Sequence, residues 1–237
     1  MSDPFFTLHA DMPREGPGDR ESLDWAMGVA NLPRDAAILD AGCGPGADIE
    51  GLLAHAPEGH VTAVDLHPGF IAQVRARWGG DPRVTARVGD MTEPEGPFDL
   101  VWSAGALYFL GITAGLAHFR TRLAPGGIVA FSELVWLGAA RPAEVVAALA
   151  EEYPPMGDIA TLEARIDAAH YDLCGLRVLP DAAWEAYYTA LDARIARLRP
   201  GADAGLSVVL DAAEAEAALW RTHREVFGYA LAVVRPR

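Results

Sequence analysis

The sequence contains no lysine. All 19 of its basic residues are arginine, and 33 acidic residues outnumber them, which gives a formal net charge of −14. Such a charge repels the phosphate backbone that supplies most of the affinity for nucleic acids, so we expect no nucleic-acid partner. The missing lysine is explained by codon bias more simply than by selection for bidentate anion contacts.

Cysteine and long apolar runs are also scarce. The two cysteines, Cys43 and Cys174, are too few for a disulfide framework, a four-cysteine zinc site or an iron-sulfur cluster. Residues 1–10 lack a basic flank followed by an apolar run, and no segment approaches the roughly 20 apolar residues of a membrane span. We expect a cytoplasmic protein, a monomer or a homodimer, with no membrane partner and no metal.

The 237 residues are 51% hydrophobic, which favours a single domain with one large core. Between residues 36 and 137, short apolar runs alternate with segments of helical periodicity, the pattern of a parallel sheet covered by helices. Beyond residue 138, alanine-rich helical segments dominate. The predicted strands are 37–40, 60–65, 83–88, 98–103, 127–134, 176–180 and 227–234.

A glycine-rich turn follows the first predicted strand. Residues 38–46 read ILDAGCGPG and run from an apolar strand into a helix, so backbone amides and a helix N-terminus meet at one edge of the sheet. Such an edge receives a nucleotide-like ligand. Gly42, Gly44 and Ala47 also satisfy the dinucleotide fingerprint G-x-G-x-x-G/A. On the glycines alone, an NAD(P)-binding oxidoreductase therefore stays open as an alternative.

The turn and later segments resemble the ordered motifs of class I S-adenosylmethionine-dependent methyltransferases. In that family an acidic residue ends the first strand, here Asp40, and a third glycine, here Gly46, follows the first two. The later matches are VDLH at 64–67, VGDM at 88–91, FDLVWSAGALY at 98–108 and LAPGGIVAF at 123–131. Because these motifs occur in the family's order, the set is far less expected by chance than any single match.

The resemblance implies an α/β fold of the Rossmann-like class I methyltransferase type. Its sheet has seven mostly parallel strands flanked by helices, with an antiparallel last strand and helical insertions after strands five and six. Within the single domain 1–237, residues 1–35 are an N-terminal helical cap and residues 36–137 are the cofactor-binding core. Residues 138–237 form the substrate side.

The resemblance also implies S-adenosylmethionine as the cofactor. A carboxylate at Asp40 assists a sulfonium amino acid but repels a diphosphate. Asp65 stands where ribose hydroxyls are accepted, with an N-cap for the following helix as the alternative. Asp90 and Met91 match the segment that holds the adenine, with an ordinary acidic turn as the alternative. The predicted cofactor-binding residues are Arg14, Gly16, Asp40, Gly42, Cys43, Gly44, Gly46, Asp65, Leu66, Asp90, Met91 and Ser103.

Over nearly the whole chain, the sequence is similar to a bacterial group of class I methyltransferases whose acceptors are taken to be small molecules. Segments 12–18, 141–144, 153–156, 179–184 and 227–229 carry this similarity. It implies that the N-terminal segment closes over the cofactor, with Arg14 and Gly16 near its methionine end. The chain departs from the group at Ala104, where a carboxylate is usual. This departure motivates a further alternative, a non-catalytic module that binds the cofactor.

Methyl transfer from a sulfonium is an in-line displacement, so the protein mainly aligns the nucleophile with the methyl and excludes water. We expect a metal-independent enzyme that methylates an N, O or C nucleophile of a small molecule. A hydroxyl acceptor needs a positioned base, which is optional for other acceptors. The catalytic candidates are Glu133, Tyr108 and His9. Glu133 is alternatively a structural ion-pair partner, and His9 a solvated surface histidine.

Overall fold

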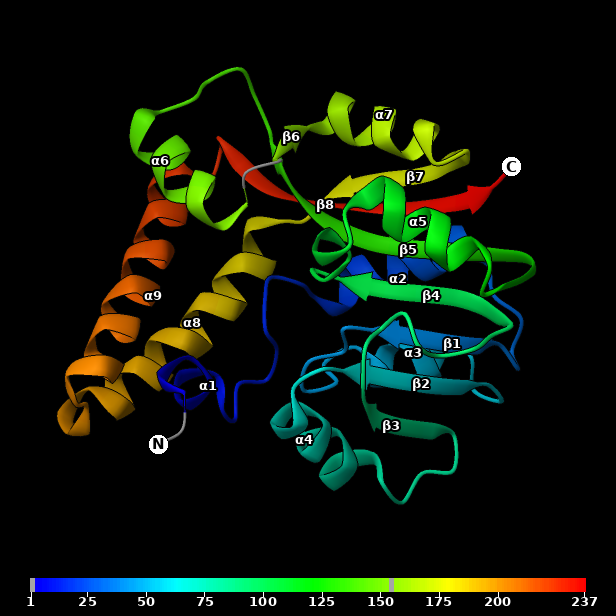
Figure 1. Ribbon diagram of the computed structural model, residues 1–237, viewed down its shortest axis with the longest axis horizontal. Coiled ribbons are helices and arrows are strands. Elements are labelled where there is room, and N and C mark those ends of the chain that lie inside the picture. The colour runs from blue at the N-terminus through cyan, green and yellow to red at the C-terminus, as the bar shows by residue number, and fades with distance from the viewer. Residues whose placement is uncertain (1–2, 154–155) are drawn as a thin grey trace.

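The computed structural model describes residues 3–153 and 156–237, and its centre is a twisted sheet in the order β3-β2-β1-β4-β5-β8-β7 (Figure 1). Strands β1 to β5 run parallel, and β8 is antiparallel to both of its neighbours. The predicted fold class is confirmed. The long strands are β1 (Ala37–Ala41), β2 (His60–Asp65), β3 (Val84–Val88), β4 (Phe98–Ala104), β5 (Leu123–Trp136), β7 (Tyr171–Val178) and β8 (Phe227–Pro236).

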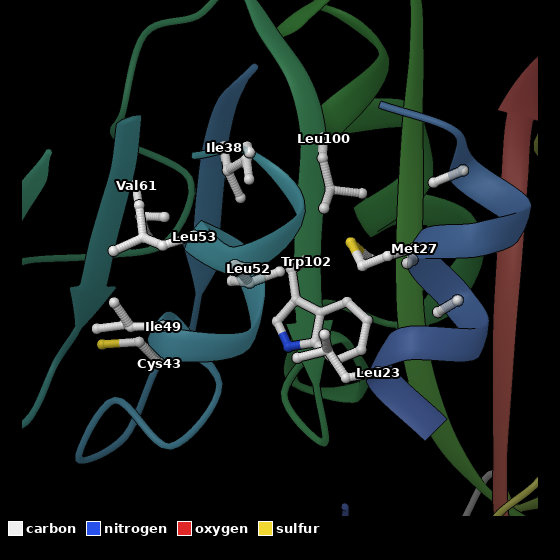
Figure 2. Packing of buried hydrophobic residues seen from close by; sticks show 14 of the residues in the cluster. Leu23, Met27, Ile38, Cys43, Ile49, Leu52, Leu53, Val61, Leu100 and Trp102 are labelled. Carbon is white, nitrogen blue, oxygen red and sulfur yellow. The ribbon is translucent and has the colours of Figure 1, made fainter. Parts of the chain in front are cut away.

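Helices cover both faces of the sheet because the central strands are apolar on both sides. On one face, Ile38 and Leu100 of the sheet pack against Leu23 and Leu52 (Figure 2), and the same cluster includes Ile71. These last three belong to α2 (Arg20–Ala30), α3 (Ile49–His55) and α4 (Pro68–Trp78). The other face packs against α5 (Ile112–Arg120) and α7 (Ile159–Ala168). A sheet enclosed in this way leaves the carboxyl ends of its parallel strands as the edge for a ligand.

The remaining helices lie at that end of the molecule. They are α1 (Pro4–His9), the 3-10 turn η1 (Leu107–Phe109), α6 (Ala143–Glu152), α8 (Asp181–Leu198), the 3-10 turn η2 (Arg199–Gly201) and α9 (Ala204–His223). The hairpin of α8 and α9 projects away from the sheet in Figure 1, with α1 packed against it. Its core is aromatic: the rings of Trp184 and Trp220 stack with centroids 5.0 Å apart.

Three strand predictions need correction. The sheet has an additional strand, β6 (Gly157–Asp158), which pairs with β5 and is too short to leave a pattern in the sequence. Strand β7 ends at Val178 and begins at Tyr171, whereas the prediction was 176–180. It is an edge strand with several exposed residues, so its sequence lacks a buried apolar run. Strand β5 exceeds its predicted range at both ends.

Candidate functional site

The turn between β1 and α3 requires glycine at its alternate positions. Gly42, Gly44 and Gly46 have φ angles of 75°, 51° and 81°, in the left-handed region that side chains disfavour. Space is limiting as well, since a Cβ on Gly42 would lie 2.4 Å from the Cβ of Ala106. The absence of a side chain at Gly42 therefore lets the turn approach the loop after β4 closely.

Asp65 fastens this turn to the end of β2. Its Oδ2 accepts a hydrogen bond from the Gly44 N–H at 2.9 Å, and its Oδ1 accepts one from the His67 N–H at 2.8 Å. His67 itself is the N-cap residue of α4. The N-cap alternative for Asp65 is therefore wrong. The carboxylate lies against the glycine turn, and its assignment to the ribose stays a prediction.

Asp40, the last acidic residue of β1, is 3% exposed. Its Oδ2 has no hydrogen-bond partner within 3–153 and 156–237. Burial raises the pKa of Asp40 well above its ordinary value, the neighbouring charges of Asp48 and Asp65 raise it further, and Arg14 opposes them. A cation placed beside Asp40 would stabilise its ionised form.

Two residues that the sequence reasoning missed hold Arg14 at the turn. Asp48 Oδ1 lies 3.5 Å from Arg14 Nη2, and the indole N–H of Trp102 donates to Asp48 Oδ2 at 2.9 Å. Arg14 Nε also donates to the carbonyl of Gly16 at 2.7 Å. Arg14, Asp48, Trp102 and Ala104 line one small pocket. A signal was available at Asp48, an acidic residue directly after the glycine turn.

The segment before α2 lies across the glycine turn. A Cβ on Gly44 would meet Glu15 Cγ at 3.2 Å, and Glu15 Oε2 lies 2.6 Å from His9 Nδ1. The ring of Phe6 stacks on that of His67 at 3.6 Å between centroids. His9 is only 7% exposed, so its reading as a solvated surface histidine is wrong. Its contact with Glu15 places it over the turn.

The remaining predicted cofactor residues have structural contacts of their own. Ser103 is fully buried and donates to the carbonyl of Ala41 at 3.0 Å. Cys43 is buried, which raises the pKa of its thiol and keeps it uncharged. Asp90 Oδ1 accepts hydrogen bonds from the backbone and hydroxyl of Thr92, the geometry of the acidic-turn alternative. These contacts place the side chains without identifying a ligand.

The two apolar residues predicted to contact the adenine differ in exposure. Leu66, directly after β2, is 69% exposed, and Met91 is partly buried against the core that includes α5 and α7. An apolar side chain left open at a ligand-binding edge offers a surface for a flat ring. The assignment of both residues to the cofactor stays a prediction.

The catalytic candidate Glu133 lies on β5 and is 1% exposed. The hydroxyl of Tyr153 donates a hydrogen bond to its Oε1, and Arg165 Nη1 lies 4.0 Å from the same oxygen. Burial raises the pKa of Glu133 to about 7, against the opposing effects of Tyr153 and Arg165. The ring of Tyr108, a second candidate, meets the Tyr153 ring edge-on at 5.3 Å. Glu133 and Tyr108 thus both contact Tyr153, whereas the third candidate, His9, contacts Glu15 instead.

No sequence signal identified Tyr153 or Arg165 as partners of Glu133, because they come from the connection after α6 and from α7. Over the described ranges, no three His, Cys, Asp or Glu side chains are grouped as metal ligands. Over the same ranges, no helix is long and apolar enough to span a membrane.

Residues 38–127 match the family of methyltransferase domains. The chain is 38% identical over 100 residues to a trans-aconitate 2-methyltransferase of Methylobacterium nodulans, which is 42% of this chain and 38% of that protein. It is 34% identical over 116 residues to a malonyl-[acyl-carrier protein] O-methyltransferase of Enterobacter lignolyticus, 48% of this chain and 45% of the relative. The chain thus spans less than half the length of these curated relatives.

The whole fold has a counterpart among solved structures. A methyltransferase from Geobacter sulfurreducens, described as SAM-dependent and solved with S-adenosyl-L-homocysteine, superposes with a TM-score of 0.85 at 22% identity. The superposition covers 100% of this chain and 99% of that one. The fold is therefore that of the Rossmann-like methyltransferases. Within this fold, residues 38–127 are the part of the chain that matches the methyltransferase domain model.

Proposed function

We propose that the protein transfers a methyl group from S-adenosylmethionine to a small-molecule acceptor, without a metal. The observation that carries the proposal is a set of buried, unpaired polar atoms around the glycine turn. Asp40 Oδ2, Glu15 Oε1 and His67 Nδ1 have no hydrogen-bond partner in the described part of the chain. Each such atom costs about 1 to 3 kcal/mol, a cost that a polar ligand at this edge offsets.

The residues present fit this cofactor in charge as well as in shape. When bound, S-adenosylmethionine supplies a methyl group on a sulfonium that is already an activated leaving group. Asp40 and Glu15 would supply negative charge to its ammonium and sulfonium, and Arg14 would supply a cation to its carboxylate. Asp65 would accept hydrogen bonds from the ribose hydroxyls, and the exposed Leu66 would offer an apolar surface to the adenine.

The same charges argue against a nicotinamide dinucleotide. A diphosphate at the turn would lie beside the buried Asp40, near Asp48 and Asp65, whose charges already raise the pKa of Asp40. Like charges at such short range are costly in a poorly solvated site. Gly42 and Gly44 fit either ligand, so the carboxylates decide between the two cofactors.

The protein's own part in the reaction is alignment and exclusion of water. Glu15 lies against Gly44 of the turn, His9 contacts Glu15, and Phe6 stacks on His67. Arg194 of α8 holds this N-terminal segment by donating to the backbone carbonyls of Thr7 and Leu8. The α8–α9 hairpin is therefore connected by hydrogen bonds to the N-terminal segment that lies against the glycine turn. Glu133 and Tyr108 stand at the acceptor side of the cofactor edge.

Calorimetry with S-adenosylhomocysteine and with NAD⁺ tests the cofactor. We expect binding of the first and none of the second, and the reverse result would remove the proposal. Transfer of label from methyl-labelled S-adenosylmethionine to a small-molecule extract tests catalysis and separates an enzyme from a non-catalytic module. We expect EDTA to leave the transfer unchanged, and size-exclusion chromatography to give a monomer or a homodimer.

A further inference from the structure

Glu133 lies at the same edge of the sheet as the cofactor turn. In the parallel register of β4 and β5, Ser132 is opposite Ala104, the last residue of β4. Glu133 is thus one residue beyond the end of β4, beside Gly105. Ligands of open α/β sheets bind outside the carboxyl ends of the parallel strands, which makes this carboxyl group part of the ligand edge.

The two oxygens of Glu133 have different surroundings. Oε1 accepts the Tyr153 hydroxyl and lies near Arg165. Oε2 is buried and has no hydrogen-bond partner among the described residues. Arg165 also forms a side-chain hydrogen bond with Tyr153, so the arginine and the phenol together fix the first oxygen. A carboxyl group held by one oxygen is oriented, and its second, buried oxygen is left without a hydrogen-bond donor among the described residues.

This arrangement opposes a carboxylate as the methyl acceptor. A second carboxylate placed at Oε2 would meet a like charge whenever Glu133 is ionised, which is the form that acts as a base. The nearby cation, Arg165, already serves Glu133 and Tyr153. An acceptor without a carboxylate would differ from those that the names of the relatives print, since trans-aconitate is a carboxylic acid and the malonyl group has a free carboxyl end.

We propose, on the basis of the methyl transfer inferred above, that the acceptor is an amine or hydroxyl compound whose N–H or O–H donates to Glu133 Oε2. Glu133 is then the catalytic base. The lone pair of the nitrogen or oxygen forms the new bond to the methyl carbon, and the bond from that carbon to sulfur breaks with its electron pair going to sulfur. The proton of the acceptor goes to Oε2, which leaves a neutral thioether and a methylated amine or ether.

The ionisable groups near Glu133 are compatible with a carboxyl group that takes up a proton and releases it. Tyr153 on the connection after α6 and Arg165 on α7 are the ionisable described residues that influence its charge. On strand β8, Ala230 is opposite Glu133 in the register, and the hydroxyl of Tyr229 lies near Gly105. A base that titrates near neutral pH can both accept the proton and release it to solvent after the reaction.

The test uses the whole chain, methyl-labelled S-adenosylmethionine and a small-molecule extract of bacterial cells. Mild alkali releases labelled methanol from methyl esters, whereas N-methyl and ether products keep their label. We expect alkali-stable label with the wild type. Glu133→Gln should lower the rate by about 100-fold or more, the usual contribution of a general base, and should bind S-adenosylhomocysteine as the wild type does.

Glu144→Gln on α6 is the matched control, because Glu144 is an exposed residue that pairs with His223. It should keep the wild-type rate. Alkali-labile label would overturn the acceptor class while leaving methyl transfer intact, and an unchanged rate for Glu133→Gln would remove the base. If S-adenosylhomocysteine does not bind, or binds and no label moves, the methyl-transfer proposal fails and this inference fails with it.

Discussion

The backbone N–H of Gly44 donates a hydrogen bond to Oδ2 of Asp65 across 2.9 Å. This contact joins the glycine turn after β1 to the last residue of β2, two motifs 21 positions apart in the chain. The carboxylate that is expected to receive the ribose therefore also shapes the turn that is expected to receive the rest of the cofactor. Substitution of Asp65 affects both.

Asp65→Ala should weaken S-adenosylhomocysteine binding by about 1 to 3 kcal/mol, because the ribose hydroxyls lose a charged partner and the turn loses its anchor. Asp65→Asn keeps an oxygen that can accept from the Gly44 N–H, so we expect an intermediate loss. Calorimetric titration of the three proteins measures the order. Wild-type affinity in the alanine variant would show that Asp65 serves the turn alone.

Alanine substitutions at Gly42 and Gly126 distinguish the effect of backbone strain from that of steric crowding at the site. Both have positive φ angles, 75° and 83°, so alanine costs about 1 to 2 kcal/mol of stability at either position. Only at Gly42 does the new Cβ meet another atom, the Ala106 Cβ at 2.4 Å. We expect Gly126→Ala to bind the cofactor normally in calorimetry, and Gly42→Ala to bind it at least tenfold more weakly. Equal affinities would contradict a turn that is closely packed under the ligand.

Asp40→Asn should raise the stability of the protein at higher pH and weaken its binding of the cofactor. The raised pKa of Asp40 means that the folded state favours the protonated form, so its contribution to stability is present at low pH and is lost as pH rises through the folded pKa. Asparagine cannot ionise, and the variant should gain stability over the wild type as pH increases. Urea unfolding at several pH values measures this difference.

The same variant should bind S-adenosylmethionine less tightly, with a smaller loss for S-adenosylhomocysteine, which lacks the sulfonium charge. An identical loss for both ligands would place Asp40 near the ammonium rather than the sulfur. A wild-type affinity for both ligands would show that Asp40 takes no part in binding the cofactor.

The sequence predicts those features that depend on local pattern. The strands β1, β2 and β4 are continuous apolar runs because helices cover both faces, and the glycine turn lies between one of them and a helix. The aromatic and aliphatic spacing of Trp184, Tyr188 and Leu191 indicates a core stripe, and all three are buried. Each of these features is determined by residues within a few turns of one another.

Partners that come from distant segments could not be predicted in the same way. Asp48 and Trp102 are 54 positions apart, and Tyr153 reaches Glu133 from 20 positions away. Nothing in the local sequence around either pair specifies the other member, because the sheet order and the path of α6 bring them together. The replacement of a usual carboxylate by Ala104 can be read from the sequence alone. The orientation of Glu133 on the neighbouring strand can be known only from the three-dimensional structure.

Tyr153 is expected to act as a positioning residue for Glu133. Its hydrogen bond lowers the pKa of the carboxyl group, which burial raises to about 7. In Tyr153→Phe that bond is lost, so the pKa of Glu133 should rise further. The base must be ionised to act, and the pH at which kcat/KM reaches half its maximum should therefore move upward, while the maximum at high pH stays within a few fold of wild type.

Stability gives a second measurement that needs no acceptor. Because the folded pKa of Glu133 is raised, its contribution to the free energy of unfolding is full below the unfolded pKa of about 4.5 and is lost as pH rises to about 7. Tyr153→Phe should extend that decrease to higher pH in urea titrations. Tyr171→Phe is the control, since it removes another buried phenol hydrogen bond, to the carbonyl of Leu116 at 2.9 Å. This control should lower stability without shifting the pH dependence of either kcat/KM or stability. If Tyr153→Phe shows the same two pH dependences as Tyr171→Phe, the Tyr153 hydroxyl does not act on the Glu133 carboxyl group.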